Sequence, residues 1–427
     1  MKEKVSKLLR TGFLHIFGSN VINKIVTFCS SFILVRVISK YDYGVYNYAY
    51  NIVSMLMIFS GLGTLSGMLQ YGSECEGEEK NAYFAFGFKV GAVSDIFIAV
   101  IVSVLACVSE LKFPEANLLL LILAWIPFTV YVKEANLIYI RTCLRNKEYS
   151  FLNTFCTVML LVTSVSGAYL FASIGLSIGQ YLAYFFTCII SVMMVSDIKD
   201  IFLSTQKLKR QQKINFMKYS LVMTFNNGIS QLLYLLDTFL IGLIVADANV
   251  IASYKTATLI PFGLNFIPAA VVTYIYPYFA KNNSDVGWIK KKYKEMLAGL
   301  AAFNFLITGA CLIFAPWIVK ILFGEQYLDC VNIFRILSIG YFFAGTFRIP
   351  GGNVLVMIKR VKFNFLVCVL SGVLNIILDI VLIVKYQSMG AAVATLAVFV
   401  FTAIMNNTYL LYIFRKDGKQ KMNSDEK

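Results

Sequence analysis

Seven basic side chains lie inside long apolar stretches of this 427-residue chain, where a charged group is costly to bury. They remain after the basic residues near the ends of those stretches are set aside: Lys24, Lys89, Lys133, Lys218, Lys255, Arg335 and Arg348. Ammonium and guanidinium groups bind phosphate or pair with carboxylates through charge-assisted hydrogen bonds. The pattern predicts anion binding or ion pairing inside an apolar protein.

Three of the seven are candidate ligands for a phosphate-bearing molecule. Lys24 sits about 12 residues into its stretch, or roughly 18 Å, which is beyond comfortable snorkelling reach. Arg348 precedes Pro350, Gly351 and Gly352, which predict a broken helix with free backbone groups. Its guanidinium could bind phosphate or those carbonyls, and both interpretations stay open. Lys255 is the third candidate. Two others, expected to snorkel to the nearby surface, are Lys133 and Lys218.

Two acids in the second half of the chain match two bases in depth. Asp237 and Asp379 lie in the outer thirds of their stretches, and Lys255 and Arg335 lie near outer ends. They predict ion pairs, either structural or acting as an outer gate.

Asp95 is the acid at mid-depth in the first half. It could be a counter-ion to Lys24 or Lys89, or a protonatable coupling site, and coupling to H⁺ or Na⁺ stays open. We expect no metal site, no other cofactor and no catalytic residue. The chain has one histidine, no CxxC pair and no paired nucleophile and base.

Neutral polar side chains suit hydroxyl-rich ligands such as sugars. Asn20 and Asn23 share a polar helix face with Lys24, and Asn227 occupies a similar place in the second half. Tyr46 belongs to KYDYGVYNYAYN, residues 40–51, which holds five tyrosines. These rings predict an aromatic belt at the outer membrane interface, or alternatively a surface that stacks on a pyranose ring.

The elements that carry these residues are transmembrane helices. The chain is 59% apolar and 14% charged, with a mean hydropathy of +0.72. Continuous apolar runs, not short alternating segments, exclude a barrel. Twelve helices are predicted, at 12–38, 44–70, 82–109, 116–140, 150–171, 175–197, 214–245, 250–279, 293–322, 329–357, 362–384 and 388–413.

The basic residues at the helix ends predict the orientation. If the N-terminus is cytoplasmic, 26 lie on the inner side and 5 on the outer side, so both termini are expected inside. The net charge of +15 then reflects topology and contact with membrane lipids, and no nucleic-acid partner is needed. The acidic inner loop at 73–80 has no functional explanation. Short outer loops leave no room for a soluble enzymatic domain.

The two halves repeat each other. Residues 44–49 align with 252–257 at an offset of 208, and 173–175 align with 388–390 at an offset of 215. An even number of crossings in each copy predicts parallel repeats about an axis along the membrane normal. The expected organisation is a six-helix lobe at 1–200, a basic linker at 201–213, a second six-helix lobe at 214–413 and a polar tail at 414–427.

Motifs in both halves resemble one known family. LVRVISKYDYGVYNYAYN followed by GLGT is similar to the opening of Wzx-type polysaccharide flippases, the O-antigen and capsule transporters. LLYLLDTFLIG, ASYKTA, IYPYFAK, LFGEQY and LNIILDIVLI with MGAAVAT resemble the same family in the same order. The resemblance implies the fold of the multidrug/oligosaccharidyl-lipid/polysaccharide exporter superfamily, with two lobes around a central cavity that opens alternately to either side.

The resemblance also implies a substrate. It would be an undecaprenyl-diphosphate-linked oligosaccharide, moved from the inner to the outer leaflet of a bacterial inner membrane for surface polysaccharide synthesis. A polysaccharide polymerase and glycosyltransferases are the implied partners. Lys24, Lys255 and Arg348 would bind the diphosphate. Two other functions are weighed: a cation-coupled multidrug exporter, disfavoured by the basic mid-depth charge, and a non-transporting scaffold, which would tolerate apolar substitution of Lys24.

Overall fold

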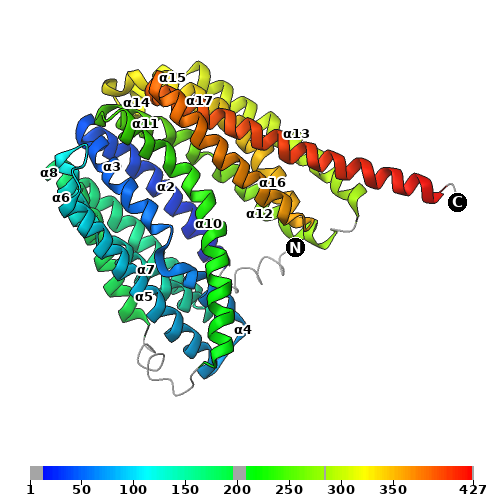
Figure 1. Cartoon of the computed structure of the whole chain (residues 1–427), viewed down its shortest axis with the longest axis horizontal. Coiled ribbons are helices and arrows are strands. Elements are labelled where there is room, and N and C mark those ends of the chain that lie inside the picture. Colours follow the sequence, from blue (N-terminus) through cyan, green and yellow to red (C-terminus); the bar gives the residue numbers. More distant parts are fainter. Residues whose placement is uncertain (1–12, 196–207, 283–284, 426–427) are drawn as a thin grey trace. The chain divides into compact units, whose positions relative to one another are not determined.

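The computed structural model describes residues 13–195, 208–282 and 285–425 (Figure 1). Every regular element in those ranges is a helix, and nine helical segments there are long and apolar enough to cross a membrane. The expected all-α membrane architecture is therefore confirmed. The basic residues before residue 13 and most of the predicted linker lie outside the described ranges.

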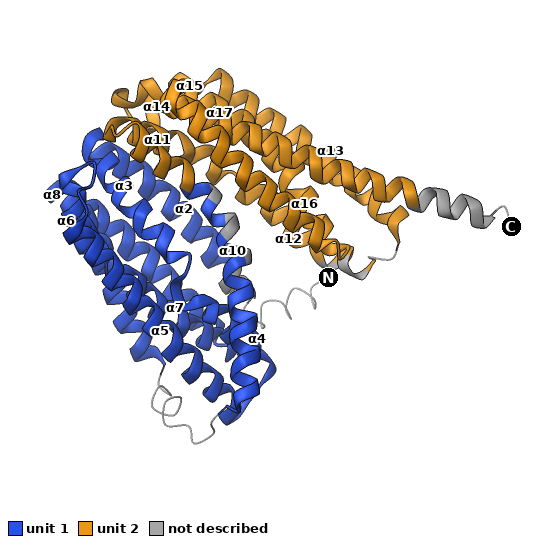
Figure 2. Cartoon of the chain, in the orientation of Figure 1, with its two compact units in different colours: residues 1–235 blue, residues 236–427 orange. Residues whose placement is uncertain are grey.

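Unit 1 comprises residues 1–235 and is one of two compact units (Figure 2). Its boundary falls inside α10, beyond the linker predicted at 201–213, and residues 210–213 of that linker already belong to the helix. The elements of unit 1 are α2 (Phe13–Val37), α3 (Lys40–Met57), η1 (Ser60–Gly63), α4 (Thr64–Glu74), α5 (Gly77–Val108), α6 (Pro114–Leu123), α7 (Ile126–Thr142), α8 (Asn146–Met194) and most of α10 (Arg210–Ile244).

Unit 2 comprises residues 236–427. It takes in the end of α10 and the helices that follow. They are α11 (Ala248–Gly263), α12 (Phe266–Lys281), α13 (Val286–Ile313), α14 (Ala315–Leu322), η2 (Glu325–Cys330), α15 (Val331–Phe343), η3 (Ala344–Arg348), α16 (Ile349–Met357) and α17 (Val361–Asp425).

The twelve predicted crossings are recovered once two long elements are divided. α8 and α17 each contain a non-helical turn, at Phe171–Ala172 and at Gln387, so each is a pair of crossings. These two pairs, the other seven spans and α10 account for all twelve. The crossing predicted at 293–322 begins and ends earlier, because α13 runs from Val286 to Ile313 and Pro316 lies in the first turn of the separate short helix α14.

The turns in α8 and α17 have the same backbone conformation. Ala172 has φ 47° and ψ −129°, and Gln387, which follows it by the predicted offset of 215, has φ 51° and ψ −132°. Each turn joins two closely packed helices. A Cβ added to Gly175 would lie 1.9 Å from the carbonyl oxygen of Gly167, and one added to Gly390 would lie 2.2 Å from that of Leu382. The internal repeat is thus visible in the geometry of both units.

The second crossing is interrupted within unit 1. Gly61, Leu62 and Gly63 all have positive φ, at 59°, 48° and 72°, which separates α3 from α4. Glycine is required at the first of these positions because a Cβ would lie 2.4 Å from the ring of Tyr131. A Cβ on Gly63 would lie 2.2 Å from the carbonyl oxygen of Ser220, so α10 packs directly against the interruption.

The tenth crossing does not break at Pro350 as the sequence predicts. The chain stays helical through this residue, and the irregularity is a π-helical turn, η3, that ends at Arg348. Proline lacks an N–H and its ring crowds the preceding turn, so one wider turn before it absorbs the mismatch without ending the helix.

Each unit has an aromatic core toward one end of its helices. The core of unit 1 gathers Phe84, Tyr131 and Phe216 from α5, α7 and α10. The core of unit 2 gathers Phe279 and Tyr293 with aliphatic residues of α16 and α17. These cores hold the crossings at fixed spacing, so the polar side chains among them have defined partners.

Candidate functional site

A polar stripe runs along α2 in unit 1. Asn20, Lys24, Thr27 and Ser31 recur at intervals of three and four residues, which places them on one face of the helix. The first three are exposed, and Lys24 has no hydrogen-bond or ion-pair partner among the described residues. α2 packs against α8 and leaves this stripe uncovered. An unpaired ammonium at mid-crossing belongs to a surface that meets water or a polar ligand, not lipid.

Asn23 lies beside this stripe, half-buried on α2. Neither its amide nitrogen nor its side-chain oxygen has a hydrogen-bond partner within the described ranges. A buried carboxamide without partners costs about 1–3 kcal/mol. It therefore favours a state in which a ligand or another polar group satisfies it.

A second polar cluster is buried in unit 2. Asp237 on α10 is 2% exposed, and Asp379 on α17 is fully buried. The amide nitrogen of Asn375 lies between them, 2.9 Å from Asp379 Oδ2 and 3.4 Å from Asp237 Oδ1. Asp237 Oδ2 also accepts hydrogen bonds from Tyr254 Oη and, at 2.6 Å, from Thr395 Oγ1.

This cluster joins two of the acids that the sequence singled out. Asp379 Oδ1 is buried and has no hydrogen-bond partner in the described part of the chain. Lys255 on α11 is close enough to Asp237 to interact with it electrostatically, although no ion pair joins them. Two carboxylates that share one amide donor concentrate negative charge and oxygen ligands, so the site suits a proton or a small hard cation.

Arg335 is not brought to the acids of unit 2. Its Nε donates to the carbonyl oxygen of Leu312 at 3.3 Å, and Nη1 lies 3.5 Å from Asn332 Oδ1. Leu312 is in the last turn of α13, where free carbonyls attract a cation. The structure thus places the second base of the expected ion-pair group at a helix end instead.

Arg348 ends the π-helical turn η3 and is half-buried. Its guanidinium lies over the ring of Phe399, 4.7 Å from the centroid. Around the turn, Asn407 donates to the carbonyl of Phe347 at 3.2 Å, and Asn304 donates to Thr346 at 3.1 Å. Carboxamides therefore satisfy the backbone and hydroxyl groups of this turn, and π-helical turns are frequent at functional sites.

Asp95 on α5 is fully buried in unit 1. Its Oδ2 accepts a hydrogen bond of 2.8 Å from the backbone N–H of Gly61, and Oδ1 has no hydrogen-bond partner among the residues described. The carboxylate therefore contacts the left-handed interruption of the second crossing and is not ion-paired with Lys24 or Lys89.

Tyr46 is buried and does not lie at an open interface. Its hydroxyl donates to Gln180, and its ring stacks on Tyr50 with 5.7 Å between centroids. Tyr43 and Tyr48 of the same motif are buried as well, so most of this tyrosine cluster faces the protein interior. The side chain of Asn227 lies outside the described residues.

For α7 the sequence prediction was wrong about Lys133 and did not include Glu134. Lys133, expected to snorkel, is 6% exposed, and its Nζ lies 2.5 Å from a carboxylate oxygen of Glu134. Its Nζ also lies 5.9 Å from the centroid of the Tyr184 ring. The signal was the adjacent Lys-Glu pair inside a membrane crossing, since two opposite charges side by side can pair there and need not reach the surface.

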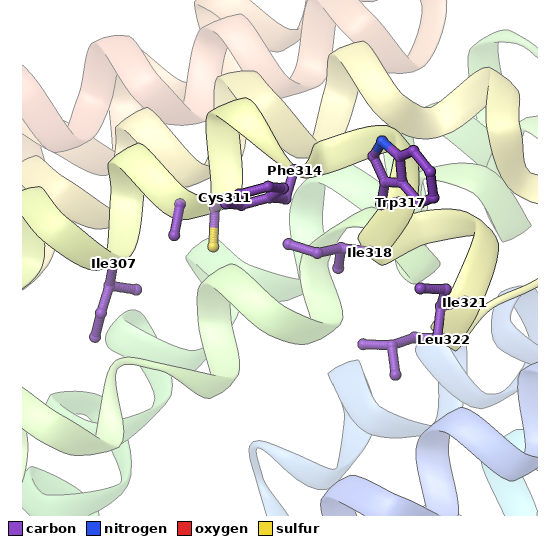
Figure 3. A pocket seen from close by; sticks show the side chains of 8 residues that line it. Ile307, Cys311, Phe314, Trp317, Ile318, Ile321 and Leu322 are labelled. Carbon is purple, nitrogen blue, oxygen red and sulfur yellow. The ribbon is translucent and has the colours of Figure 1, made fainter.

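An apolar groove of about 540 Å³ lies between α13 and α14 in unit 2 (Figure 3). Ile307 and Cys311 line it from one helix, and Trp317 and Ile318 from the other. Close by, Lys320 and Glu325 form an exposed ion pair of 2.8 Å. The ring of Trp317 is 68% exposed, as is common for tryptophans at membrane interfaces.

Comparison with known proteins identifies the family. The model of the family described as "Polysaccharide biosynthesis protein" matches residues 33–332. The chain belongs to this family. The family resemblance found in the sequence motifs is thereby confirmed.

Two curated archaeal proteins are similar in sequence. A protein named probable low-salt glycan biosynthesis flippase Agl15, from Haloferax volcanii, is 25% identical over 260 residues, or 58% of this chain and 52% of the relative. An uncharacterized membrane protein of Methanocaldococcus jannaschii is 27% identical over 194 residues, or 42% of this chain and 36% of the relative. The chain thus matches about half or less of each relative's length.

Solved structures show the same fold at low identity. The inward closed conformation of the lipid II flippase MurJ gives a TM-score of 0.75 at 18% identity, covering 94% of this chain and 87% of that one. An inward-facing multidrug resistance MATE family transporter of the MOP superfamily gives 0.71 at 11% identity, covering 93% and 96%. This polysaccharide biosynthesis protein therefore has the fold of those transporters.

Proposed function

We propose that this chain is a flippase that moves an undecaprenyl-diphosphate-linked oligosaccharide from the inner to the outer leaflet of a bacterial inner membrane. The observation that carries the proposal is the uncovered polar stripe of α2, with Lys24 unpaired at its centre within the described chain. Such a substrate has phosphates and sugars that cannot enter hydrocarbon, so its carrier needs a cationic polar path. Family membership and a similar protein named as a glycan biosynthesis flippase support the assignment.

The cationic residues proposed for diphosphate binding are Lys24 in unit 1 and, in unit 2, Arg348 and Lys255. Arg348 is half-buried beside the π-helical turn, where its fork could meet two phosphate oxygens. Asn20 and Asn23 of α2 would bind sugar hydroxyls next to the phosphates, which would satisfy the unpartnered carboxamide of Asn23.

The buried acids of unit 2 would couple transport to an ion. Asp237 and Asp379 share the amide nitrogen of Asn375, and a proton or Na⁺ binding between them would change which groups donate hydrogen bonds there. Alternating access would follow, with the substrate entering from the cytoplasmic side and the lipid tail remaining in the bilayer. A polymerase and glycosyltransferases would act before and after this step, on an O-antigen or capsule pathway.

Substitution of Lys24 tests the proposal. Lys24→Ala should abolish surface polysaccharide while membrane abundance stays normal, and Lys24→Arg should retain part of the activity because the charge survives. A lost charge-assisted contact weakens phosphate binding by about 1.5–3 kcal/mol, or roughly 10- to 150-fold. Lys218→Ala, an exposed lysine of α10 predicted to sit at the membrane surface, is the matched control and should export normally. Normal export from Lys24→Ala would overturn the proposal.

Cysteine labelling tests the orientation. A cysteine introduced at Asn249, exposed at the start of α11, should react with a membrane-impermeant maleimide added outside intact cells. One introduced at Lys291, exposed in α13, should react only after the cells are permeabilised. The reverse pattern would place both termini outside.

A further inference from the structure

Glu134 is a partly exposed carboxylate inside the membrane crossing Pro114–Thr142. It lies eight residues before the end of α7, about 12 Å along the helix, and its side chain is 39% exposed. A carboxylate at this depth is costly against lipid, so this face of unit 1 meets water or a polar ligand. Its partner Lys133 is buried beneath it, with a side chain 7% exposed.

Two tyrosine rings lie on the same part of unit 1. Lys133 Nζ is 5.9 Å from the centroid of the Tyr184 ring, which joins the charged pair to α8. Tyr50 is connected to α8 through Tyr46, whose ring stacks on Tyr50 and whose hydroxyl donates to Gln180. Both tyrosines are half-buried, so part of each side chain remains accessible.

The depths of these residues agree along their helices. Tyr50 is ten residues into α3, about 15 Å from its start, and Tyr184 is twelve residues past the turn at Ala172, about 18 Å. Behind Tyr50, the ring of Tyr46 stacks at an interplanar angle of 10° and fixes its orientation. The two tyrosines therefore lie at similar depth, and Glu134 lies within the membrane-spanning part of the same unit.

We propose that Tyr50, Tyr184 and Glu134 bind a sugar ring of the lipid-linked substrate, a subsite that rests on the proposed function. Aromatic rings stack on the C–H face of a pyranose, and a carboxylate accepts hydrogen bonds from its hydroxyls. A diphosphate is not the ligand here, because Glu134 would repel it. In this proposal Lys24 would bind the diphosphate of the substrate, and the subsite of Tyr50, Tyr184 and Glu134 would bind a sugar.

Binding of two lipids to the full-length protein in nanodiscs tests this subsite. The probes are undecaprenyl diphosphate, which has no sugar, and undecaprenyl-diphosphate-N-acetylglucosamine. The wild-type chain should bind the glycosylated lipid more tightly. Tyr50→Ala, Tyr184→Ala and Glu134→Gln should each cut that preference about 10-fold without changing the affinity for the bare lipid. Tyr50→Phe should keep part of it, because the ring remains.

The controls separate this inference from the proposed function. Tyr181→Ala, on the same helix and stacked on Phe185, should change neither affinity. Lys24→Ala should weaken the binding of both lipids by the same factor. If the wild-type chain binds neither lipid, the proposed function fails. If it binds both and the tyrosine variants keep the preference for the glycosylated lipid, this subsite is refuted. The subsite is also refuted if Glu134→Gln is the only variant that lowers this preference, because that result indicates a proton-carrying role.

Discussion

Equivalent tyrosines in the two units have different partners. In unit 1 the Tyr46 hydroxyl donates to Gln180 of α8. In unit 2 Tyr254 takes the place of Tyr46 and Thr395 that of Gln180, at the two repeat offsets, and the oxygens of these residues lie 3.3 Å apart. The same contact between the second and sixth crossings is kept, but the Tyr254 hydroxyl also donates to a carboxylate, Asp237.

The acids themselves have no counterpart in unit 1. At the repeat offsets, Cys29 stands where unit 2 has Asp237, and Ser164 where it has Asp379. Leu160 replaces the bridging Asn375. One helical scaffold thus carries an ion-type ligand set in unit 2 and neutral residues in unit 1. The fold is therefore repeated without repetition of the buried acids, which is the contrast that the predictions below test.

Removing an acid of unit 2 should give the largest effect. Asp237→Asn and Asp379→Asn should each abolish transport, because a carboxamide carries no charge for a coupled ion. Purified protein should remain folded, since each asparagine keeps one acceptor for the existing donors. The matched changes Cys29→Ser and Ser164→Ala should leave export within about twofold. Polysaccharide export and membrane abundance are measured for each variant. Equal losses of export in variants of both units would contradict a special role for the acids of unit 2.

Tight hairpins should be sensitive in both units. Gly175→Ala and Gly390→Ala each place a Cβ about 2 Å from a backbone carbonyl, so the paired helices must separate. Overpacking of this kind costs about 1–3 kcal/mol and should lower the unfolding temperature of both variants. Gly309→Ala is the control, since nothing lies within 4 Å of its added Cβ. A normal unfolding temperature in either hairpin variant would show that its helices are held less closely.

The crossings were predictable because each is a local property of composition. Continuous apolar length determined the twelve segments, and the offset of 215 predicted a repeat that Ala172 and Gln387 display in their backbone angles. The tyrosines of residues 40–51 were harder. Their amphipathic rings predicted an interface, whereas packing against α6 and α8 buries Tyr43, Tyr46 and Tyr48. Which face of a crossing is covered depends on its neighbours, which sequence periodicity does not reveal.

The candidate sites were predicted in part for the same reason. A charge in an apolar run is conspicuous, so Lys24, Asp237 and Asp379 were singled out as candidates from the sequence alone. The partners of the charged residues were not predicted. Arg335 shares the depth of the two acids but caps α13, and Asp95 bonds the backbone of Gly61 in place of a lysine. Depth along a helix is readable from the sequence, whereas rotation about its axis is not.

Loss of a tyrosine hydroxyl should be felt more strongly in unit 2. Tyr254→Phe removes a donor to a carboxylate, worth about 1.5–3 kcal/mol, whereas Tyr46→Phe removes a bond between neutral groups, worth about 0.5–1.5 kcal/mol. Thermal unfolding of the purified protein should therefore show the larger decrease for Tyr254→Phe. A larger decrease for Tyr46→Phe would mean that the bond from Tyr254 to Asp237 is no stronger than one between neutral groups.

The hairpin turns should give the smallest effect, and an equal one. Ala172 and Gln387 have positive φ without being glycine, a conformation that strains an L-residue by about 1–3 kcal/mol. Ala172→Gly and Gln387→Gly remove that strain, but glycine gains entropy in the unfolded chain, so a net stabilisation of about 0.5–1 kcal/mol is expected. Both variants should raise the unfolding temperature by similar small amounts, with export unchanged. Ala168→Gly, buried in the regular helix before the first turn, should instead lower it. The backbone angles of the two turns agree to within a few degrees. If the unfolding temperature rose for one variant and fell for the other, the two turns would differ in strain although they have the same backbone conformation.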